Sequence, residues 1–219
     1  MIFAYLLGNP NITITGIILL ATCVWSYVAE ENPHRKIKWL MNPGWIARRK
    51  EYHRFLTSGF IHDGYMHLVF NMIALYSFGL NVEGVFLDNY GEFGALIFLI
   101  FYLSAMVFAD LPDYFKYRHT DLYNALGASG AVSAVVFASI LYNPLNGVFL
   151  FLIPIPIPGF IFAALYLFYS DYMAKHGNDN IGHTAHFYGS IYGIAFCVLL
   201  DPQVVVLFFR QIMEWRGFF

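Results

Sequence analysis

The sequence predicts an all-α, polytopic membrane protein. Of its 219 residues, 59% are hydrophobic, 20% are aromatic and only 12% are charged. An average soluble domain carries about twice that charged fraction. The mean hydropathy of the chain is +0.58, and its apolar residues fall into six runs long enough to form helices. Several apolar runs separated by polar segments are typical of a chain that crosses the bilayer repeatedly.

The same pattern predicts the domain organisation. Residues 1–219 contain no internal repeat, no low-complexity tract and no segment that reads as a soluble domain, so we expect a single membrane domain. The net charge of −2 gives no indication of nucleic-acid binding. Cys23 and Cys197 both lie within apolar runs, so we expect unpaired core cysteines and no disulfide.

The first half of the chain contains three predicted spans. We expect them at Ile12–Ala29, His67–Leu87 and Phe93–Ala109, with a polar stretch at 110–124 after the third. The long connection 30–66 is polar, but it contains Trp39, Trp45 and several basic residues. Aromatic and basic residues together favour the boundary between membrane and water, so we expect this connection to lie at the interface.

The fourth predicted span, Ser129–Tyr142, is short. As a helix it would measure about 21 Å, whereas the apolar core of a bilayer is about 30 Å thick. If Asn143 and Pro144 mark one surface, Ser129 lies below the other. The backbone before Ser129 must then dip into the membrane, which is tolerated only where it is enclosed by protein or lines a wet cavity.

The last two spans lie on either side of a polar loop. The prolines of 154–159 cannot lie within a regular helix, so we expect the fifth span to begin at about Gly159 and to end near Asp171. The polar loop 175–180 then leads to the sixth span, which we expect at His183–Leu200.

The first candidate site lies at the start of the fourth span, in the sequence Gly127-Ala128-Ser129-Gly130. Small residues around a serine allow helices to pack closely in lipid, which is a purely structural role. They also leave room for a substrate carbonyl beside the serine and expose backbone N–H groups, which suits a nucleophile. The motif alone does not separate these two interpretations.

The second candidate is a histidine in the sixth span. His186, Gly189, Ser190 and Gly193 follow the spacing i, i+3, i+4, i+7, so they lie on one face of the helix. A face this small lets another helix approach closely, and the small residues of the fourth span make that span a fitting partner. His186 then either activates Ser129 as a base or bonds a backbone carbonyl in a structural role.

Two further sets of polar residues have possible chemistry. His67 and Asn71 lie one turn apart at the start of the second span, where their N–H donors suit an oxyanion or ordinary hydrogen bonds within the bundle. No carboxylate in the sixth span can orient His186, so a Ser–His dyad is simpler than a triad. The competing chemistry is a zinc site at His183, His186 and Asp179, but the sequence lacks a His-Glu-x-x-His motif.

In combination these motifs resemble the rhomboid family of intramembrane serine proteases. The resemblance runs from about Tyr52 to Leu200 and includes a first loop in which His53-Arg54 replaces the usual Trp-Arg pair. The motifs also have the family's order along the chain: His67-x-x-x-Asn71, Gly127-Ala128-Ser129-Gly130 and Ala185-His186-x-x-Gly189-x-x-x-Gly193.

The resemblance implies a six-transmembrane-helix bundle and an endopeptidase activity. It implies that other membrane proteins are cut in or near their transmembrane segments, through an acyl-enzyme and without a cofactor or metal. Ser129 would be the nucleophile and His186 the general base. His67, Asn71 and backbone N–H near Ser129 would form the oxyanion hole. The implied partners are transmembrane substrates and the lipid bilayer, with no nucleic acid.

Several alternatives stay open. A rhomboid-like protein that binds membrane helices without cleaving them is the main rival, although such relatives usually lack the serine or the histidine. A small transporter would be expected to show an ion-coupling carboxylate or a repeat within its spans. Many family members carry a tyrosine four residues after the nucleophile, stacked on the base. Here that residue is Ser133, and Tyr192 or Phe187 could take the place of the missing ring.

Orientation is predicted differently by charge and by family. The basic residues gather on the side of the first loop, and only Arg210 and Arg216 lie on the other side. The positive-inside rule would place the first loop in the cytoplasm, whereas typical bacterial members of the family place it outside. We expect a multi-pass protein of a bacterial inner membrane, in the family orientation.

Overall fold

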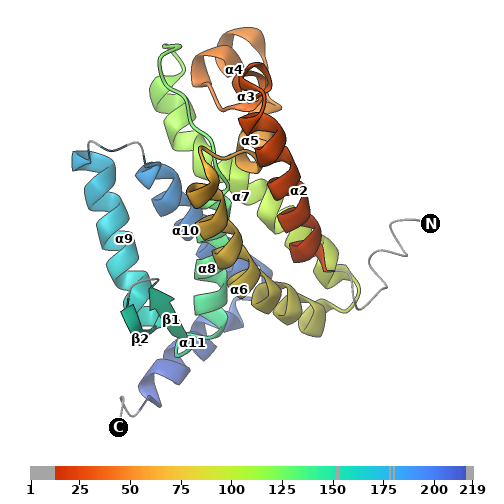
Figure 1. The fold of residues 1–219 in the computed structure, drawn as a ribbon. Helices are drawn as coiled ribbons and strands as arrows, with labels where there is room; N and C mark the ends of the chain where they lie inside the picture. The colour runs from red at the N-terminus through yellow and green to blue at the C-terminus, as the bar shows by residue number, and fades with distance from the viewer. Residues whose placement is uncertain (1–12, 151–152, 178, 180, 216–219) are drawn as a thin grey trace.

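The computed structural model describes residues 13–150, 153–177, 179 and 181–215, and these residues are mostly helical (Figure 1). The elements that correspond to the predicted spans are α2 (Ile14–Glu30), α6 (Tyr65–Tyr90), α7 (Phe93–Tyr117), α8 (Ser129–Tyr142), α9 (Gly159–His176) and α10 (His183–Leu200). Both α8 and α10 have the bounds that the sequence predicts. The predicted start of the first span, Ile12, lies outside the described residues.

Membrane-crossing capacity differs among these helices. Within the described part of the chain, α6 and α7 are long and apolar enough to cross a membrane. A third candidate is the pair formed by α10 and α11 (Gln203–Met213), which meet at a bend of 111°. The shorter helices α2 and α8 are also apolar. The structure therefore supports a helical membrane protein with two or three candidate spans, which is fewer than the predicted six.

Three segments differ from the sequence prediction. The first loop, residues 30–66, contains four short helices: α3 (Pro33–Trp39), α4 (Pro43–Arg49), α5 (Arg54–Thr57) and the 3-10 helix η1 (Ser58–Phe60). Asn32 and Asn42 cap α3 and α4, and a proline follows each cap. The third helix continues beyond Ala109 to Tyr117, because Asp110 and Asp113 face the interior instead of ending it.

The third difference is a small sheet, so the fold is not wholly α-helical. Strands β1 (Gly147–Leu150) and β2 (Ile153–Pro158) pair in an antiparallel hairpin, with Val148 opposite Ile157. The prolines end helical structure as predicted, but their alternation with isoleucine also permits an extended strand at an edge. The hairpin lies at the end of the bundle opposite the first loop (Figure 1).

Helix α2 is attached to α6 through a buried carboxylate. Glu83 accepts hydrogen bonds from the backbone N–H of Ile14 at 2.6 Å and of Thr15 at 2.9 Å, and from the Thr15 hydroxyl at 2.6 Å. These N–H groups belong to the first turn of α2, where the helix itself offers them no partner and the helix dipole favours a negative charge. Cys23 on the same helix is exposed, contrary to the predicted core position, whereas Cys197 is buried.

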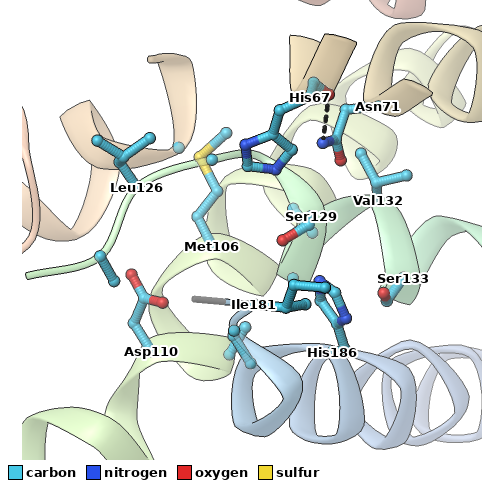
Figure 2. A pocket seen from close by; sticks show the side chains of 18 of the residues that line it. His67, Asn71, Met106, Asp110, Leu126, Ser129, Val132, Ser133, Ile181 and His186 are labelled. Carbon is cyan, nitrogen blue, oxygen red and sulfur yellow. Dashed lines mark hydrogen bonds between the residues drawn. The ribbon is translucent and has the colours of Figure 1, made fainter. Parts of the chain in front are cut away.

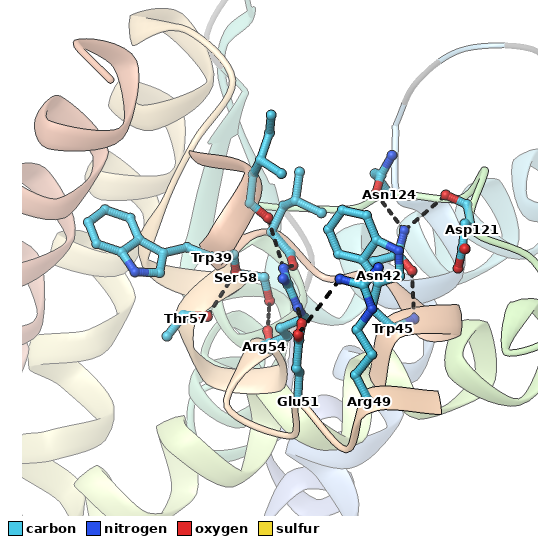
Figure 3. A network of polar contacts seen from close by, with 12 residues as sticks. Trp39, Asn42, Trp45, Arg49, Glu51, Arg54, Thr57, Ser58, Asp121 and Asn124 are labelled. Atoms are coloured by element: carbon cyan, nitrogen blue, oxygen red, sulfur yellow. Dashed lines mark hydrogen bonds and ion pairs between the residues drawn. The ribbon is translucent and has the colours of Figure 1, made fainter. Parts of the chain in front are cut away.

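The first loop is held together by Arg54, which is buried despite its charge (Figure 3). Its guanidinium donates to Glu51 at 2.6 Å and to the backbone carbonyls of Ile37 and Leu40 at 2.9 and 2.7 Å. It also lies 4.8 Å from the centre of the Trp45 ring. A buried charge with this many partners fixes the loop in one arrangement, which matters because the loop contacts the turn before α8.

Helix α8 is the centre of the bundle, and α10 packs closely against it. A β-carbon placed on Gly189 would overlap the backbone of Gly130, and one placed on Gly193 would overlap the backbone of Ala134. The two backbones therefore touch at two successive turns, as the spacing of small residues predicts. We call this contact the α8–α10 seam. It brings the first turn of α8 beside the first turn of α10.

Candidate active site

The four predicted site residues line one cavity of about 1120 Å³. Figure 2 shows Ser129 and His186 facing this cavity from α8 and α10, with His67 and Asn71 on α6. The residues come from three helices that are far apart in the sequence. The structure therefore brings together the serine, the histidine and both donors that the sequence singled out.

Ser129 is the first residue of α8, so its backbone N–H has no partner within the helix. Gly127, two residues earlier, has a φ of +119°, a conformation that residues with a side chain rarely adopt. A β-carbon at Gly127 would also lie 2.7 Å from the His67 ring. Glycine is therefore required there both by the turn and by the approach of His67 to the backbone that carries Ser129.

The turn before Ser129 is bonded to the first loop at three points. Ala125 and Met41 exchange backbone hydrogen bonds of 3.0 and 2.9 Å. The Gly127 N–H donates to the Ser58 carbonyl at 2.9 Å, and the Ala128 N–H donates to Nε2 of His62 at 3.2 Å. Because the first loop is itself fixed, these bonds determine where the serine lies.

His62 is a site residue that the sequence analysis missed. It is buried, and its ring lies 4.9 Å from that of His67. Burial lowers the pKa of His62 to about 3, so the ring is neutral. Nε2 accepts from Ala128, so the proton is on Nδ1, which donates to the Ser26 hydroxyl at 3.0 Å. No local sequence pattern indicates this role, because the partners of His62 lie on α2 and before α8.

His67 and Asn71 lie one turn apart on α6, as predicted. The Asn71 amide already donates one hydrogen bond of 3.0 Å to the His67 carbonyl, which holds its side chain in place (Figure 2). The second N–H of that amide is available to another acceptor. With the Ser129 backbone N–H, the two side chains place three possible donors around the serine.

The His186 ring is contacted mainly by other rings. Among the described residues it forms no hydrogen bond with Ser129, and catalytic hydrogen bonds are often longer without substrate. The Tyr166 ring of α9 stacks on it with centroids 6.2 Å apart and planes inclined by 29°. The Tyr166 hydroxyl is bonded to Ser133 at 2.8 Å. Tyr166 therefore fills the space that Ser133 leaves.

The two other candidates for this stacking role have different partners. The Tyr192 hydroxyl donates to Ser104 at 2.6 Å, and the Tyr192 ring stacks with that of Phe108 at 4.7 Å. The Phe187 ring contacts that of its neighbour Tyr188 at 5.4 Å. These contacts point both rings away from the stacking role, which Tyr166 takes instead.

His183, three residues before His186 on α10, is buried. Its Nε2 is 3.1 Å from Asp179, and this hydrogen bond lowers the pKa of that carboxyl. The His183 and His186 rings are 6.0 Å apart and nearly perpendicular. Within the described part of the chain, no group of three or more His, Cys, Asp or Glu side chains is arranged to hold a metal ion, including the suggested zinc ligands.

Two carboxylates of α7 also reach the cavity. Asp110 and Asp113 line it, and Asp113 accepts a hydrogen bond of 2.6 Å from the Tyr123 hydroxyl. Burial and the neighbouring Asp113 raise the pKa of Tyr123, so its hydroxyl stays protonated as a donor. The sequence analysis missed both aspartates, because it assigned them to a polar connection outside the third span.

Comparison with known proteins identifies three relatives whose names contain the word rhomboid. RHOMBOID-like protein 12, mitochondrial, of Arabidopsis thaliana is 30% identical over 148 residues, covering 63% of this chain and 43% of the relative. Rhomboid protease AarA of Providencia stuartii is 30% identical over 101 residues, or 42% and 34%. Rhomboid protease GluP of Bacillus subtilis (strain 168) is 30% identical over 150 residues, or 68% and 27%. The matched regions span less than half of each relative.

The family of this chain follows from a match to a protein-family model. The model for the Rhomboid domain matches residues 49–203, from the first loop to the start of α11. This range is more than half of the chain, and it contains the serine, the histidine and the two donors around the cavity. The chain belongs to the rhomboid family of membrane proteins.

Proposed function

We propose that this protein is an intramembrane serine endopeptidase that cleaves other membrane proteins in or near their transmembrane segments. The observation that carries the proposal is the shared cavity, in which Ser129, His186, His67 and Asn71 face one another from three helices. Two curated relatives are named as rhomboid proteases. Family membership and the geometry of the cavity both support a Ser–His dyad.

The reaction would proceed in two steps. His186 takes the proton of the Ser129 hydroxyl as the oxygen attacks the scissile carbonyl, and it then delivers that proton to the leaving amine. The negative oxygen is stabilised by the Ser129 backbone N–H, His67 and Asn71. In the second step His186 deprotonates a water molecule, which releases the acyl group and restores the serine.

The proposal includes the membrane arrangement. Helices α2, α6, α7, α8, α9 and α10 would each cross the bilayer, with the short helix α8 enclosed by the others. Most residues of α8 are buried, so it need not match the thickness of the lipid. The partners would be transmembrane substrates within the bilayer. A bacterial inner membrane stays a prediction, because the relatives include a mitochondrial protein.

The test of this proposal is the change Ser129→Ala. We expect it to abolish cleavage of a panel of single-span substrates in liposomes, and to abolish labelling by a fluorophosphonate probe, while the protein still folds. The matched control is Ser139→Ala, at the other end of α8, where the hydroxyl donates to Asn81 at 3.0 Å. Cleavage that survives in Ser129→Ala would exclude the dyad. A folded wild type that binds these substrates without cutting or labelling would be a silent relative.

A further inference from the structure

Tyr166 connects three helices at the candidate base. Its hydroxyl is bonded to Ser133, which lies one turn after Ser129 on α8. Its ring stacks on His186 of α10 and packs against Phe137 of α8, with centroids 5.6 Å apart. The hydroxyl anchors the ring at its far end, so the position of the ring follows the position of α9 relative to α8.

The rest of α9 is covered much less by neighbouring helices. Among the residues of this helix, only Gly159 and Ser170 are buried, and Phe168 is 74% exposed. One turn after Tyr166, the Tyr169 ring meets the His183 ring edge-on at 5.6 Å. Helix α9 therefore contacts both histidines of α10 through tyrosines, and each contact is lost if the helix moves outward.

We propose that Tyr166 is a positioning residue for His186, so that the dyad is competent only while α9 is seated against α8 and α10. This inference rests on the proposed protease function. The last torsion of a histidine side chain is broad, so a ring without hydrogen bonds depends on its neighbours for orientation. A misplacement of about 1 Å at a reacting group costs about 100-fold in rate. Outward movement of α9 would thus switch off the base.

The test compares variants at two tyrosines of α9. Tyr166→Leu removes the stacked ring, and we expect kcat to fall about 10- to 100-fold with little change in KM. Tyr166→Phe keeps the ring and loses only the bond to Ser133, so it should stay within about threefold of wild type. Tyr169→Leu is the matched control, because its ring contacts His183 instead of His186.

A second readout separates positioning from substrate admission. The rate at which a small fluorophosphonate labels Ser129 needs an active base but no passage of a transmembrane segment past α9. We expect Tyr166→Leu to slow this labelling in proportion to kcat. An unchanged labelling rate, or a faster cleavage rate, would overturn the inference, because either result means that Tyr166 only obstructs the substrate.

The outcomes also separate this inference from the proposed function. If wild type is labelled at Ser129 and Tyr166→Leu is labelled equally fast, only the role of Tyr166 fails. If wild type is neither labelled nor active, both the protease proposal and the proposed role of Tyr166 fail. Should Tyr166→Leu not fold, Tyr166→Met keeps most of the apolar volume without a planar ring, and the same loss of kcat is expected of it.

Discussion

The turn that carries Ser129 and the ring of His186 are held by different kinds of contact. The turn forms backbone hydrogen bonds with the first loop, which is fixed by buried Arg54. The His186 ring is contacted by Tyr166 and His183, and Tyr166 belongs to a helix with few buried residues. Ser129, the proposed nucleophile, is thus fixed by directional bonds, whereas His186, the proposed base, depends on packing that can be released.

This difference matters for the proposed protease, whose transmembrane substrates would enter from the bilayer. Movement of α9 would leave the bonds around Gly127 and Ala128 intact, because none of them involves α9. Under the proposed function, the turn that carries Ser129 would keep its geometry through each cycle, and the contacts of His186 with α9 would form again when the helix returns.

The largest expected effect is the loss of the base itself. His186→Ala should lower kcat/KM by about 10²–10⁴-fold, the usual contribution of a general base, and should suppress probe labelling to a similar extent. His183→Ala should keep most of the activity. It should nevertheless lower the melting temperature, because it removes a buried ring bonded to Asp179. Cleavage assays and thermal unfolding of both variants in detergent measure these effects.

Opposite results would change the assignment. An inactive His183→Ala together with an active His186→Ala would make His183 the base. The ring that contacts the base would then be that of Tyr169 instead of Tyr166. Inhibition of wild type by a chelator would point to a metal and exclude a simple dyad.

The next largest effect concerns the α8–α10 seam, which sets the positions of both Ser129 and His186. Gly189→Ala should lower the free energy of unfolding by about 3 kcal/mol, because its β-carbon would overlap the backbone of Gly130, which cannot shift cheaply. Activity should fall as well, since the seam sets the distance between the serine and the histidine. Denaturant unfolding and cleavage rates of the purified variant test both expectations.

Gly84→Ala is the matched control for this substitution. A β-carbon at Gly84 on α6 would have no neighbour within 4 Å. Alanine is favoured over glycine in a helix by about 1 kcal/mol. The control should therefore be neutral or slightly stabilised. Equal stability of Gly189→Ala and Gly84→Ala would mean that the two backbones are not in contact.

The sequence predicted those parts of the site that depend on spacing along one helix. The starts of α8 at Ser129 and α10 at His183 follow from small residues and polar loops, and the close seam follows from the i, i+3, i+7 pattern. His67 and Asn71 share a face for the same reason. These features are local, so the chain itself specifies them.

The features that were missed depend on pairing between distant segments. Nothing near Tyr166 indicates that it lies over His186, and nothing near His62 indicates a bond to Ala128. The β1–β2 hairpin was not predicted, because the prolines of 154–158 indicate only that this segment is not helical. Asp110 and Asp113 were placed outside the third span, because a carboxylate at the end of an apolar run usually ends it. Their partners appear only once the helices have packed.

The smallest expected effect concerns the neutral ring of His62, which accepts from the turn before Ser129. It is a change in the pH dependence of the free energy of unfolding. Burial lowers the pKa of His62 from about 6.5 to about 3. Below pH 6.5 the unfolded chain binds a proton that the folded chain resists, so the stability present above pH 6.5 declines as the pH falls toward 3. Between pH 7 and 5.5 the free energy of unfolding falls by about 1 kcal/mol through this group.

His62→Gln keeps an acceptor for the Ala128 N–H and cannot titrate, so its free energy of unfolding should fall less than that of wild type over this interval. His53→Gln, which removes an exposed histidine of the same loop, is the matched control and should follow wild type. Parallel curves for wild type and His62→Gln would show that the His62 ring is not buried as a neutral acceptor. The hydrogen bond from Ala128 to His62 would then not help to hold the turn before Ser129.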